Sequence, residues 1–216
     1  MKNFFPKGKL VDDRQMDEAG TEPRLLCTVK ADGQDSGAVV WFTGLSGAGK
    51  STVARLVHKE LKERGFRTEL LDGDVVRKSL TRDLGFTRNE REENIRRIGF
   101  VAELLSRHGV IVLVAAITPY RSMRKELRNQ IRRFIEVYID APLEVCERRD
   151  PKGLYRKARA GQLPQFTGID DPYEAPLRPD LHCCTDKETI DESVAKTMAH
   201  IKQALLTPAI DPSNLD

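Results

Sequence analysis

The stretch AVVWFTGLSGAGKS, residues 38–51, joins a continuous apolar run to a glycine-rich turn that ends in Lys-Ser. The turn satisfies the pattern G-x-x-x-x-G-K-[ST] directly after a predicted strand and directly before a predicted helix. Gly44, Gly47 and Gly49 allow backbone N–H groups to curl around phosphate oxygens, and the helix presents its positive N-terminal end to the same anion. The stretch therefore predicts a P-loop that binds a nucleotide.

The residues expected to contact ATP in this loop are Gly44, Leu45, Ser46, Gly47, Ala48, Gly49, Lys50, Ser51 and Thr52. Lys50 should reach the β- and γ-phosphates, and Ser51 should ligate Mg²⁺. The N-K-x-D motif of GTPases does not occur in the chain. Asp140 closes an apolar strand as an ATPase acid would, but Ala-Pro follows it, and we interpret Asp140 as structural. A small-molecule kinase fits better, because the arginine-rich region 86–97 and the segment 150–176 could cover an acceptor site.

Outward from the P-loop, short apolar runs alternate with stretches of helical spacing. Strands are predicted at 38–43, 67–72, 110–117, 134–140 and about 181–185, and helices at about 50–64, 88–108, 121–131, up to 149 and about 187–206. Strands that are apolar throughout indicate a parallel sheet with helices on both faces. We predict an α/β P-loop NTPase fold of the nucleoside-monophosphate-kinase type.

Three segments follow from this reading of the chain. Residues 38–206 are predicted to form the kinase domain, in which the Pro/Gly-rich part after residue 150 supplies a lid. Residues 1–37 should form a partly disordered arm with a short ordered piece at 25–29, and residues 207–216 a flexible tail.

Composition narrows the possible partners and the compartment. The formal net charge is only +3, from 36 basic and 33 acidic residues, which argues against bulk nucleic-acid binding. The four cysteines, at 27, 146, 183 and 184, form no C-x-x-C, which favours reduced thiols over a disulfide framework or a zinc site. The chain shows no signal-peptide pattern and no apolar run of about 18 residues. We expect a cytoplasmic protein that binds no membrane.

The stretch LLDGDVVR, residues 70–77, places two aspartates on either side of one glycine. A tight turn accommodates Asp-Gly-Asp without any further role. The same carboxylates, Asp72 and Asp74, could instead hold a metal ion and take a proton. The local sequence leaves both interpretations open.

Five stretches together resemble the adenylylsulfate kinase (APS kinase) family. In family order they are WFTGLSGAGKST (41–52), LLDGDVVR (70–77), GFTRNEREENIRR (85–97), ITPYR (117–121) and KGLYRKARAGQLPQFTGIDDPYEAP (152–176). The resemblance covers about 38–205 and implies transfer of the γ-phosphoryl group of ATP, with Mg²⁺, to the 3′-hydroxyl of adenosine 5′-phosphosulfate. The products are 3′-phosphoadenylyl sulfate and ADP, in sulfate assimilation. The resemblance also implies a homodimer.

By position in the family pattern, nine residues are expected to bind the acceptor: Asp74, Arg77, Phe86, Arg91, Asn94, Ile117, Thr118, Lys157 and Phe166. The arginines and Asn94 would hold the phosphosulfate and ribose, and Lys157 would add a cation. Phe86 and Phe166 would sandwich the adenine. Core packing is the alternative for both rings, but their polar, glycine-flanked surroundings favour stacking.

The remaining assignments concern ATP and catalysis. Arg149 and Lys152 are expected in the lid over ATP. Asp72, with Ser51, would reach Mg²⁺, directly or through water. Asp74 would orient or deprotonate the 3′-hydroxyl, and Lys50 would neutralise the phosphate charge.

Two departures and three alternatives accompany this resemblance. Thr118 stands where the family commonly has serine, and the N-terminal arm differs from the usual family leader. A kinase for another small acceptor remains possible, as does a non-catalytic nucleotide-binding regulator, although intact Lys50, Ser51 and Asp74 argue against the latter. The third alternative is one module of a sulfurylase–kinase assembly. Its sulfurylase is expected to be a separate chain, because no such domain fits in 216 residues.

Overall fold

The structure is a computed structural model that describes residues 37–206. The predictions for the N-terminal arm, its short piece at 25–29 and the C-terminal tail lie outside the described residues.

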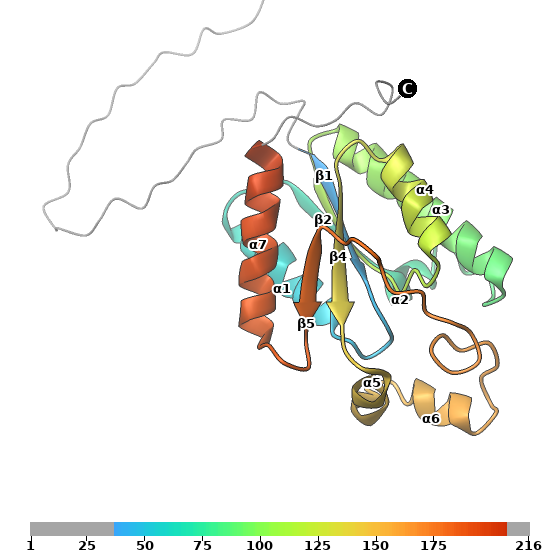
Figure 1. Ribbon diagram of the computed structural model, residues 1–216. Helices are drawn as coiled ribbons and strands as arrows, with labels where there is room; N and C mark the ends of the chain where they lie inside the picture. Colours follow the sequence, from blue (N-terminus) through green and yellow to red (C-terminus); the bar gives the residue numbers. More distant parts are fainter. Residues whose placement is uncertain (1–36, 207–216) are drawn as a thin grey trace, which may run out of the picture. The chain divides into compact units, whose positions relative to one another are not determined.

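Figure 1 shows a sheet between two layers of helices. The elements in chain order are β1 (Ala38–Thr43), α1 (Lys50–Glu63), β2 (Thr68–Asp72), α2 (Gly73–Val76), α3 (Arg88–Arg107), β3 (Ile111–Ala115), α4 (Arg121–Gln130), β4 (Phe134–Asp140), α5 (Leu143–Arg149), α6 (Leu154–Arg159), β5 (Leu181–Cys184) and α7 (Ile190–Leu206).

The sheet has five strands in the order β2-β3-β1-β4-β5, and every neighbouring pair is parallel. The predicted parallel α/β architecture is confirmed, with strand ends that differ from the predicted ones by at most two residues. Two short helices, α2 and α6, were not predicted. Within residues 37–206 no helix is both long and apolar enough to cross a membrane.

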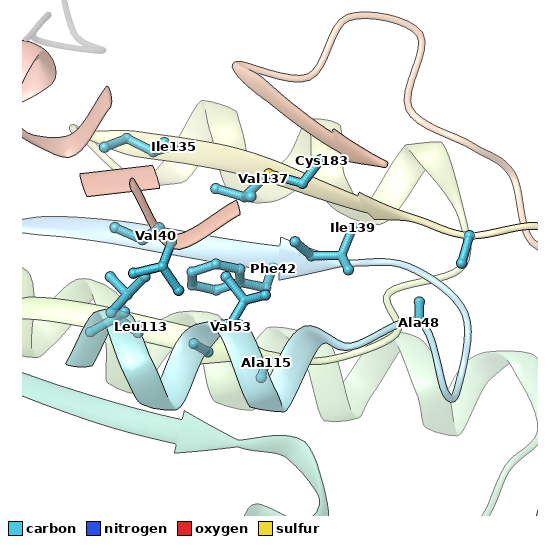
Figure 2. Close-up of a cluster of buried hydrophobic side chains, with 14 of the residues drawn as sticks. Val40, Phe42, Ala48, Val53, Leu113, Ala115, Ile135, Val137, Ile139 and Cys183 are labelled. Carbon is cyan, nitrogen blue, oxygen red and sulfur yellow. The ribbon is translucent and has the colours of Figure 1, made fainter. Parts of the chain in front are cut away.

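Both faces of the sheet are covered by apolar packing. On one face, Val53 and Val57 of α1 and Ile201 of α7 pack on Phe42 and neighbouring strand residues. Figure 2 shows this cluster, with Val40 and Phe42 of β1 pointing toward α1. On the other face, α3 and α4 cover Trp41 and its neighbours. The continuous apolar runs arise because every position of β1 is buried, as in sheets covered on both faces.

All five strands run in the same direction, so their carboxyl ends lie along one edge of the sheet. The P-loop follows β1 there, Asp72 closes β2, and Ile117 and Thr118 follow β3. Ligands of open α/β sheets bind outside this edge. The fold therefore brings the predicted site residues from separate parts of the chain to one side of the molecule.

Helix α3, which carries Arg91 and Asn94, begins at a capping box. The Thr87 side chain accepts the Glu90 backbone N–H, and the Glu90 carboxylate accepts the Thr87 N–H at 3.0 Å. Such reciprocal caps satisfy two otherwise unpaired backbone donors. The first turn of α3 is therefore held in place where it faces the carboxyl edge.

Candidate active site

A cavity of about 750 Å³ opens at the carboxyl edge of the sheet. This main cavity has the size of a small-molecule site. One end is lined by the P-loop from Ser46 to Thr52, and the other by residues of α2, α3 and the segments after them. The predicted site residues that line it are Ser46, Gly47, Ala48, Gly49, Lys50, Ser51, Thr52, Asp74, Arg77, Phe86, Arg91, Asn94, Ile117, Thr118, Arg149, Lys152 and Phe166. Gly44, Leu45, Asp72 and Lys157 are not among its lining residues.

The P-loop has the conformation that its glycines allow. Gly47 and Gly49 have φ values of 75° and 109°, in the region that favours glycine. Gly44 also lies close to the neighbouring strand β4, because a Cβ at this position would lie 2.2 Å from the Ile139 carbonyl oxygen. The spacing of these glycines in the sequence therefore reflects backbone geometry as well as phosphate contact.

Lys50 is the first residue of α1 and is buried beneath the loop. Its Nζ donates to the carbonyl oxygens of Gly44 at 2.9 Å and Leu45 at 2.7 Å. Burial, and then the positive charge of Lys152, lower the pKa of Lys50 to about 8. A bound triphosphate would favour the charged form again, because an opposite charge nearby raises the pKa of a lysine.

The lowered pKa of Lys50 predicts a pH dependence of nucleotide binding. Below about pH 8 the free protein carries a cationic Lys50, and above it Lys50 loses its proton. We therefore expect kcat/KM for ATP to fall as the pH rises through about 8, since this ratio reports groups of the free enzyme. A pH series of initial rates measures this alkaline limb.

Lys152→Ala supplies a comparison for that limb, because loss of the second cation should raise the pKa of Lys50 and move the limb to higher pH. Lys157→Ala, which removes a lysine outside the main cavity, should leave its midpoint unchanged. Two results would contradict the assignment of the alkaline limb to Lys50. One is a rate that does not fall at alkaline pH, and the other is a midpoint that is the same in Lys152→Ala as in the unaltered protein.

The two aspartates of LLDGDVVR have different environments. Asp72 is buried, its Oδ1 accepts the Asp74 N–H at 3.0 Å as the N-cap of α2, and its Oδ2 accepts from Arg55 at 3.1 Å. Asp74 lines the main cavity with a side chain that is 59% exposed, and it forms an ion pair with Lys152. Shaping the turn is therefore a function of Asp72, whereas the Asp74 carboxylate faces the ligand space.

The acceptor end of the cavity is built around Phe86. The Arg77 guanidinium lies 4.4 Å from the centre of the Phe86 ring, and its Nη1 donates to the Gly85 carbonyl oxygen at 3.0 Å. Arg91 Nε donates to the Phe86 carbonyl oxygen at 2.8 Å, and its Nη2 donates to the Gln165 carbonyl oxygen. Each arginine thus also positions backbone around the cavity.

Two cations lie close together at this end of the cavity and favour the binding of an anion. Burial, and then the charge of Arg91, lower the pKa of Arg77 from its ordinary value. Like charges that are forced together in a partly buried place are stabilised when an anion lies between them. Guanidinium groups also match sulfate and phosphate oxygens with forked donors.

The environments of Asn94 and Phe166 combine packing with access to the cavity. Thr81 Oγ1 donates to Asn94 Oδ1 at 2.7 Å, which leaves the amide NH₂ group for a ligand. Phe166 is 8% exposed and packs edge-on against Tyr155 at 5.0 Å. Phe166 therefore fits the core-packing alternative in large part, whereas Phe86 is 48% exposed and available for stacking.

Thr118 has an unusual backbone. Its φ of 47° is left-handed, which is rare for a β-branched residue. Trp41 Nε1 donates to Thr118 Oγ1 at 2.8 Å, and Arg124 Nη1 donates to its carbonyl oxygen at 2.5 Å. Strain of this kind persists where the surroundings over-determine it, often at ligand sites. The buried hydroxyl is therefore engaged with the sheet, and Thr118 shapes the wall beneath the acceptor.

The predicted lid cations lie at different distances from the loop. Arg149 Nη2 donates to the Thr185 carbonyl oxygen at 2.6 Å, and its Nη1 donates to the Gly47 carbonyl oxygen at 3.4 Å. Lys152 reaches Asp74 across the main cavity. Lys157 is exposed and lines a separate smaller hollow beside α6, so its contact with the acceptor stays a prediction that depends on movement of this segment.

Sequence reasoning missed three residues that hold the site in shape. Trp41 orients Thr118, Tyr155 donates to the Ser46 carbonyl oxygen at 2.9 Å, and Thr185 donates to the Ala48 carbonyl oxygen at 2.7 Å. Thr185 ends the last predicted strand, and that position at the carboxyl edge was the available signal for it. Trp41 and Tyr155 lie within the family-like stretches but carry no local mark of these contacts.

Asp140 has side-chain partners of its own, away from the main cavity. Tyr138 Oη donates to its Oδ1 at 2.9 Å, and its Oδ2 lies 2.9 Å from His182 Nε2. Asp140 does not line the main cavity. These contacts agree with the structural interpretation of this residue.

A P-loop at one end of a cavity and a cationic, aromatic wall at the other define a P-loop kinase for a small anionic acceptor. The sequence model of the adenylylsulphate kinase family matches residues 36–184. This chain belongs to that family.

Individual relatives agree with this membership. An adenylyl-sulfate kinase from Rippkaea orientalis is 56% identical over 170 residues, which are 79% of this chain and 94% of the relative. One from Microcystis aeruginosa is 60% identical over 160 residues, 74% of this chain and 88% of the relative. The solved structure of the Mycobacterium tuberculosis APS kinase CysC in complex with AMPPNP and APS has a TM-score of 0.75 and 48% identity. It covers 77% of this chain and 98% of its own.

Proposed function

We propose that this chain transfers the γ-phosphoryl group of ATP to the 3′-hydroxyl of adenosine 5′-phosphosulfate. The products are 3′-phosphoadenylyl sulfate and ADP. The observation that carries this proposal is that one cavity runs from the P-loop to the wall formed by Arg77, Phe86 and Arg91. A cavity of this kind can hold a triphosphate and an anionic adenine nucleotide end to end.

Different residues would bind the two nucleotides. The P-loop amides and Lys50 would hold and neutralise the phosphates of ATP, and Arg149 would close over the loop. The Phe86 ring would stack on the acceptor adenine, and Arg77 and Arg91 would bind its phosphosulfate. Asp74 lies between the two ends and would accept the proton of the attacking hydroxyl.

Magnesium fits the donor atoms at the P-loop end. Ser51 offers a hydroxyl and Asp72 a carboxylate, and both are the hard oxygen ligands that Mg²⁺ prefers. Asp72 already caps α2 and pairs with Arg55, so a bridging water is its simplest route to the ion. When bound with ATP, Mg²⁺ neutralises charge on the β- and γ-phosphates.

Coupled measurement of ADP release tests the proposal directly. Release should be slow with ATP alone and rise strongly when adenosine 5′-phosphosulfate is added. AMP, other nucleoside monophosphates and antibiotic acceptors should give little stimulation, because none supplies the phosphosulfate that the two arginines would bind. Equal or greater stimulation by another acceptor would refute the proposed substrate while leaving the kinase class intact.

Direct transfer predicts a mild phenotype at Thr118. Alignment and charge stabilisation suffice for in-line transfer between two bound nucleotides, and the Thr118 hydroxyl is already bonded to Trp41. Thr118→Ala should retain most of kcat and raise the acceptor KM moderately. Its thermal stability should fall, because the buried Trp41 N–H loses its partner at a cost of about 1–3 kcal/mol.

Rapid quench with γ-labelled ATP and no acceptor examines the same point and should trap no phosphothreonine. A labelled Thr118 peptide that passes its phosphate to added acceptor at a competent rate would establish a covalent relay instead.

We further propose that the protein acts as a homodimer in the cytoplasm and that a separate ATP sulfurylase is a partner. Light scattering of the purified protein, alone and with a sulfurylase, distinguishes a dimer from other states and detects a complex.

A further inference from the structure

Three side chains with metal-binding atoms converge at the carboxyl ends of β4 and β5, outside the main cavity. They are Asp140, His182 and Cys184, and their ligand atoms all lie within 4.8 Å of one another. His182 Nε2 lies between the other two, at 2.9 Å from Asp140 Oδ2 and 3.6 Å from Cys184 Sγ. No other such group occurs among the residues that the structure describes.

The alternation of side chains along these strands explains the grouping. Ile139 and Cys183 point into the apolar cluster beneath α1 and α7. Their neighbours Asp140, His182 and Cys184 therefore point to the opposite face of the sheet. β4 and β5 pair in parallel with Asp140 opposite Cys184, and Figure 1 shows the two strands side by side at the edge of the sheet.

The two separations from the His182 nitrogen can be compared with those around one tetrahedral ion. Zinc bonds of about 2.0–2.1 Å to nitrogen, 2.0–2.2 Å to oxygen and 2.3 Å to sulfur place ligand nitrogen about 3.4 Å from oxygen and about 3.6 Å from sulfur. The observed nitrogen-to-sulfur separation is 3.6 Å. The nitrogen-to-oxygen separation of 2.9 Å is that of a hydrogen bond, and it needs to widen by about half an ångström to admit the ion.

The ligands are also oriented by neighbouring groups. Tyr138 Oη donates to the other carboxylate oxygen of Asp140 at 2.9 Å. The His182 ring stacks on the Tyr138 ring, with centroids 5.0 Å apart and an interplanar angle of 16°. Such outer contacts fix ligand orientation and strengthen metal binding. The side chains of His182 and Asp140 remain 47% and 35% exposed, so an ion can enter from solvent.

We propose that Asp140, His182 and Cys184 form a binding site for a divalent transition metal of the zinc type, separate from the Mg²⁺ that accompanies ATP. A thiolate and an imidazole select such ions over Mg²⁺, which prefers oxygen ligands. Binding would replace the His182–Asp140 hydrogen bond and release the proton of the Cys184 thiol. Three protein ligands leave a fourth position for water.

The site lies one residue from a contact with the P-loop. Thr185 follows Cys184, its N–H donates to the Asp140 carbonyl oxygen at 2.8 Å, and its hydroxyl donates to the Ala48 carbonyl oxygen at 2.7 Å. An ion that clamps β4 to β5 would therefore restrain the support of the loop. We expect it to raise the melting temperature, because a ligand of the folded state stabilises that state.

Titration with Co²⁺ tests the proposal on the full-length chain, with Cys27→Ser as the parent so that this additional thiol cannot contribute. We expect one equivalent of Co²⁺ to give the near-ultraviolet absorption of a cobalt–thiolate bond, which Zn²⁺ should then abolish. The apparent affinity should rise with pH, because the ligands must lose protons. Zn²⁺ should also raise the melting temperature of the parent.

Two variants and two matched controls make the assignment specific. Cys184→Ser should abolish the thiolate absorption, and His182→Asn should weaken Co²⁺ binding by more than about 10-fold, the least that loss of even an outer contact costs. Cys183→Ala should retain the signal, because that thiol is in the core and burial raises its pKa to about 11. His200→Asn on α7 should also retain it.

Absence of a thiolate signal in the parent would overturn the proposal. A signal that survives in both the Cys184 and His182 variants would overturn it too, as would a Zn²⁺-induced rise in melting temperature of equal size in all the proteins. His182 is exposed, so its variant provides a test even if the Cys184 variant folds poorly.

Discussion

Replacing Asp74 with asparagine should lower kcat by about 10²- to 10⁴-fold, the usual contribution of a positioned general base, with little change in the KM for ATP. Asparagine keeps the size of the side chain and removes its ability to take the proton of the 3′-hydroxyl. Asp74 lines the cavity between the P-loop and the acceptor wall, which is the position that such a base requires. Steady-state kinetics with both substrates varied provides the measurement.

Three further variants separate catalysis from other roles of Asp74. Lys152→Ala removes the ion pair with Asp74 without removing the carboxylate, so it should cost much less in kcat if the carboxylate is the base. Asp72→Asn should also cost less, because an asparagine oxygen can still cap α2. Asp191→Asn, at an exposed position on α7, should change nothing. Near-normal kcat in Asp74→Asn would mean that the Asp-Gly-Asp stretch serves only the turn.

Arg77→Ala should raise the acceptor KM by about 10- to 100-fold, corresponding to loss of charge-assisted hydrogen bonds of about 1.5–3 kcal/mol, while ATP binding stays nearly unchanged. The structure gives a second reason for this effect. The guanidinium packs on the Phe86 ring and holds the Gly85 carbonyl oxygen, so its loss should also loosen the stacking surface for adenine. Arg77→Lys should recover little, because an ammonium group lacks the planar fork.

A control for charge is Arg82→Ala, because Arg82 is exposed and does not line the main cavity. It should leave both KM values unchanged. Arg91→Ala should resemble Arg77→Ala and also lower the melting temperature, because Arg91 is buried and joins the backbone at Phe86 to that at Gln165. Equal losses for ATP and acceptor in the Arg77 variant would indicate a general folding defect and refute the assignment.

The alternation of apolar runs and helical spacing was enough to predict the parallel sheet and its helices. β1 and β3 are strong local signals, because every position of each is buried and burial on both faces requires apolar residues throughout a continuous run. The short helices α2 and α6 escaped prediction. Four or six residues are too few for a helical period, and α2 depends on the Asp72 cap.

The P-loop could likewise be predicted in detail, because its functional groups lie in one contiguous stretch and its glycines act through their own backbone. Contacts between distant residues could not. Trp41 and Thr118 are 77 residues apart, and Arg91 and Gln165 are 74 apart. No periodicity relates such pairs, since only the folded chain brings them together.

The sequence by itself determined the fold class and the P-loop, and its resemblance to a family supplied the residues predicted to bind the acceptor. Tertiary structure decided which of those residues face the cavity and which support the fold. It made Asp72 the cap and left Asp74 facing the cavity, and it packed Phe166 against Tyr155 while leaving Phe86 exposed. It also placed Asp140 beside His182 and Cys184, which the cysteine spacing gave no reason to expect. The physical reason is that burial and partner geometry depend on which strands pair and in what register, and these are properties of the whole sheet.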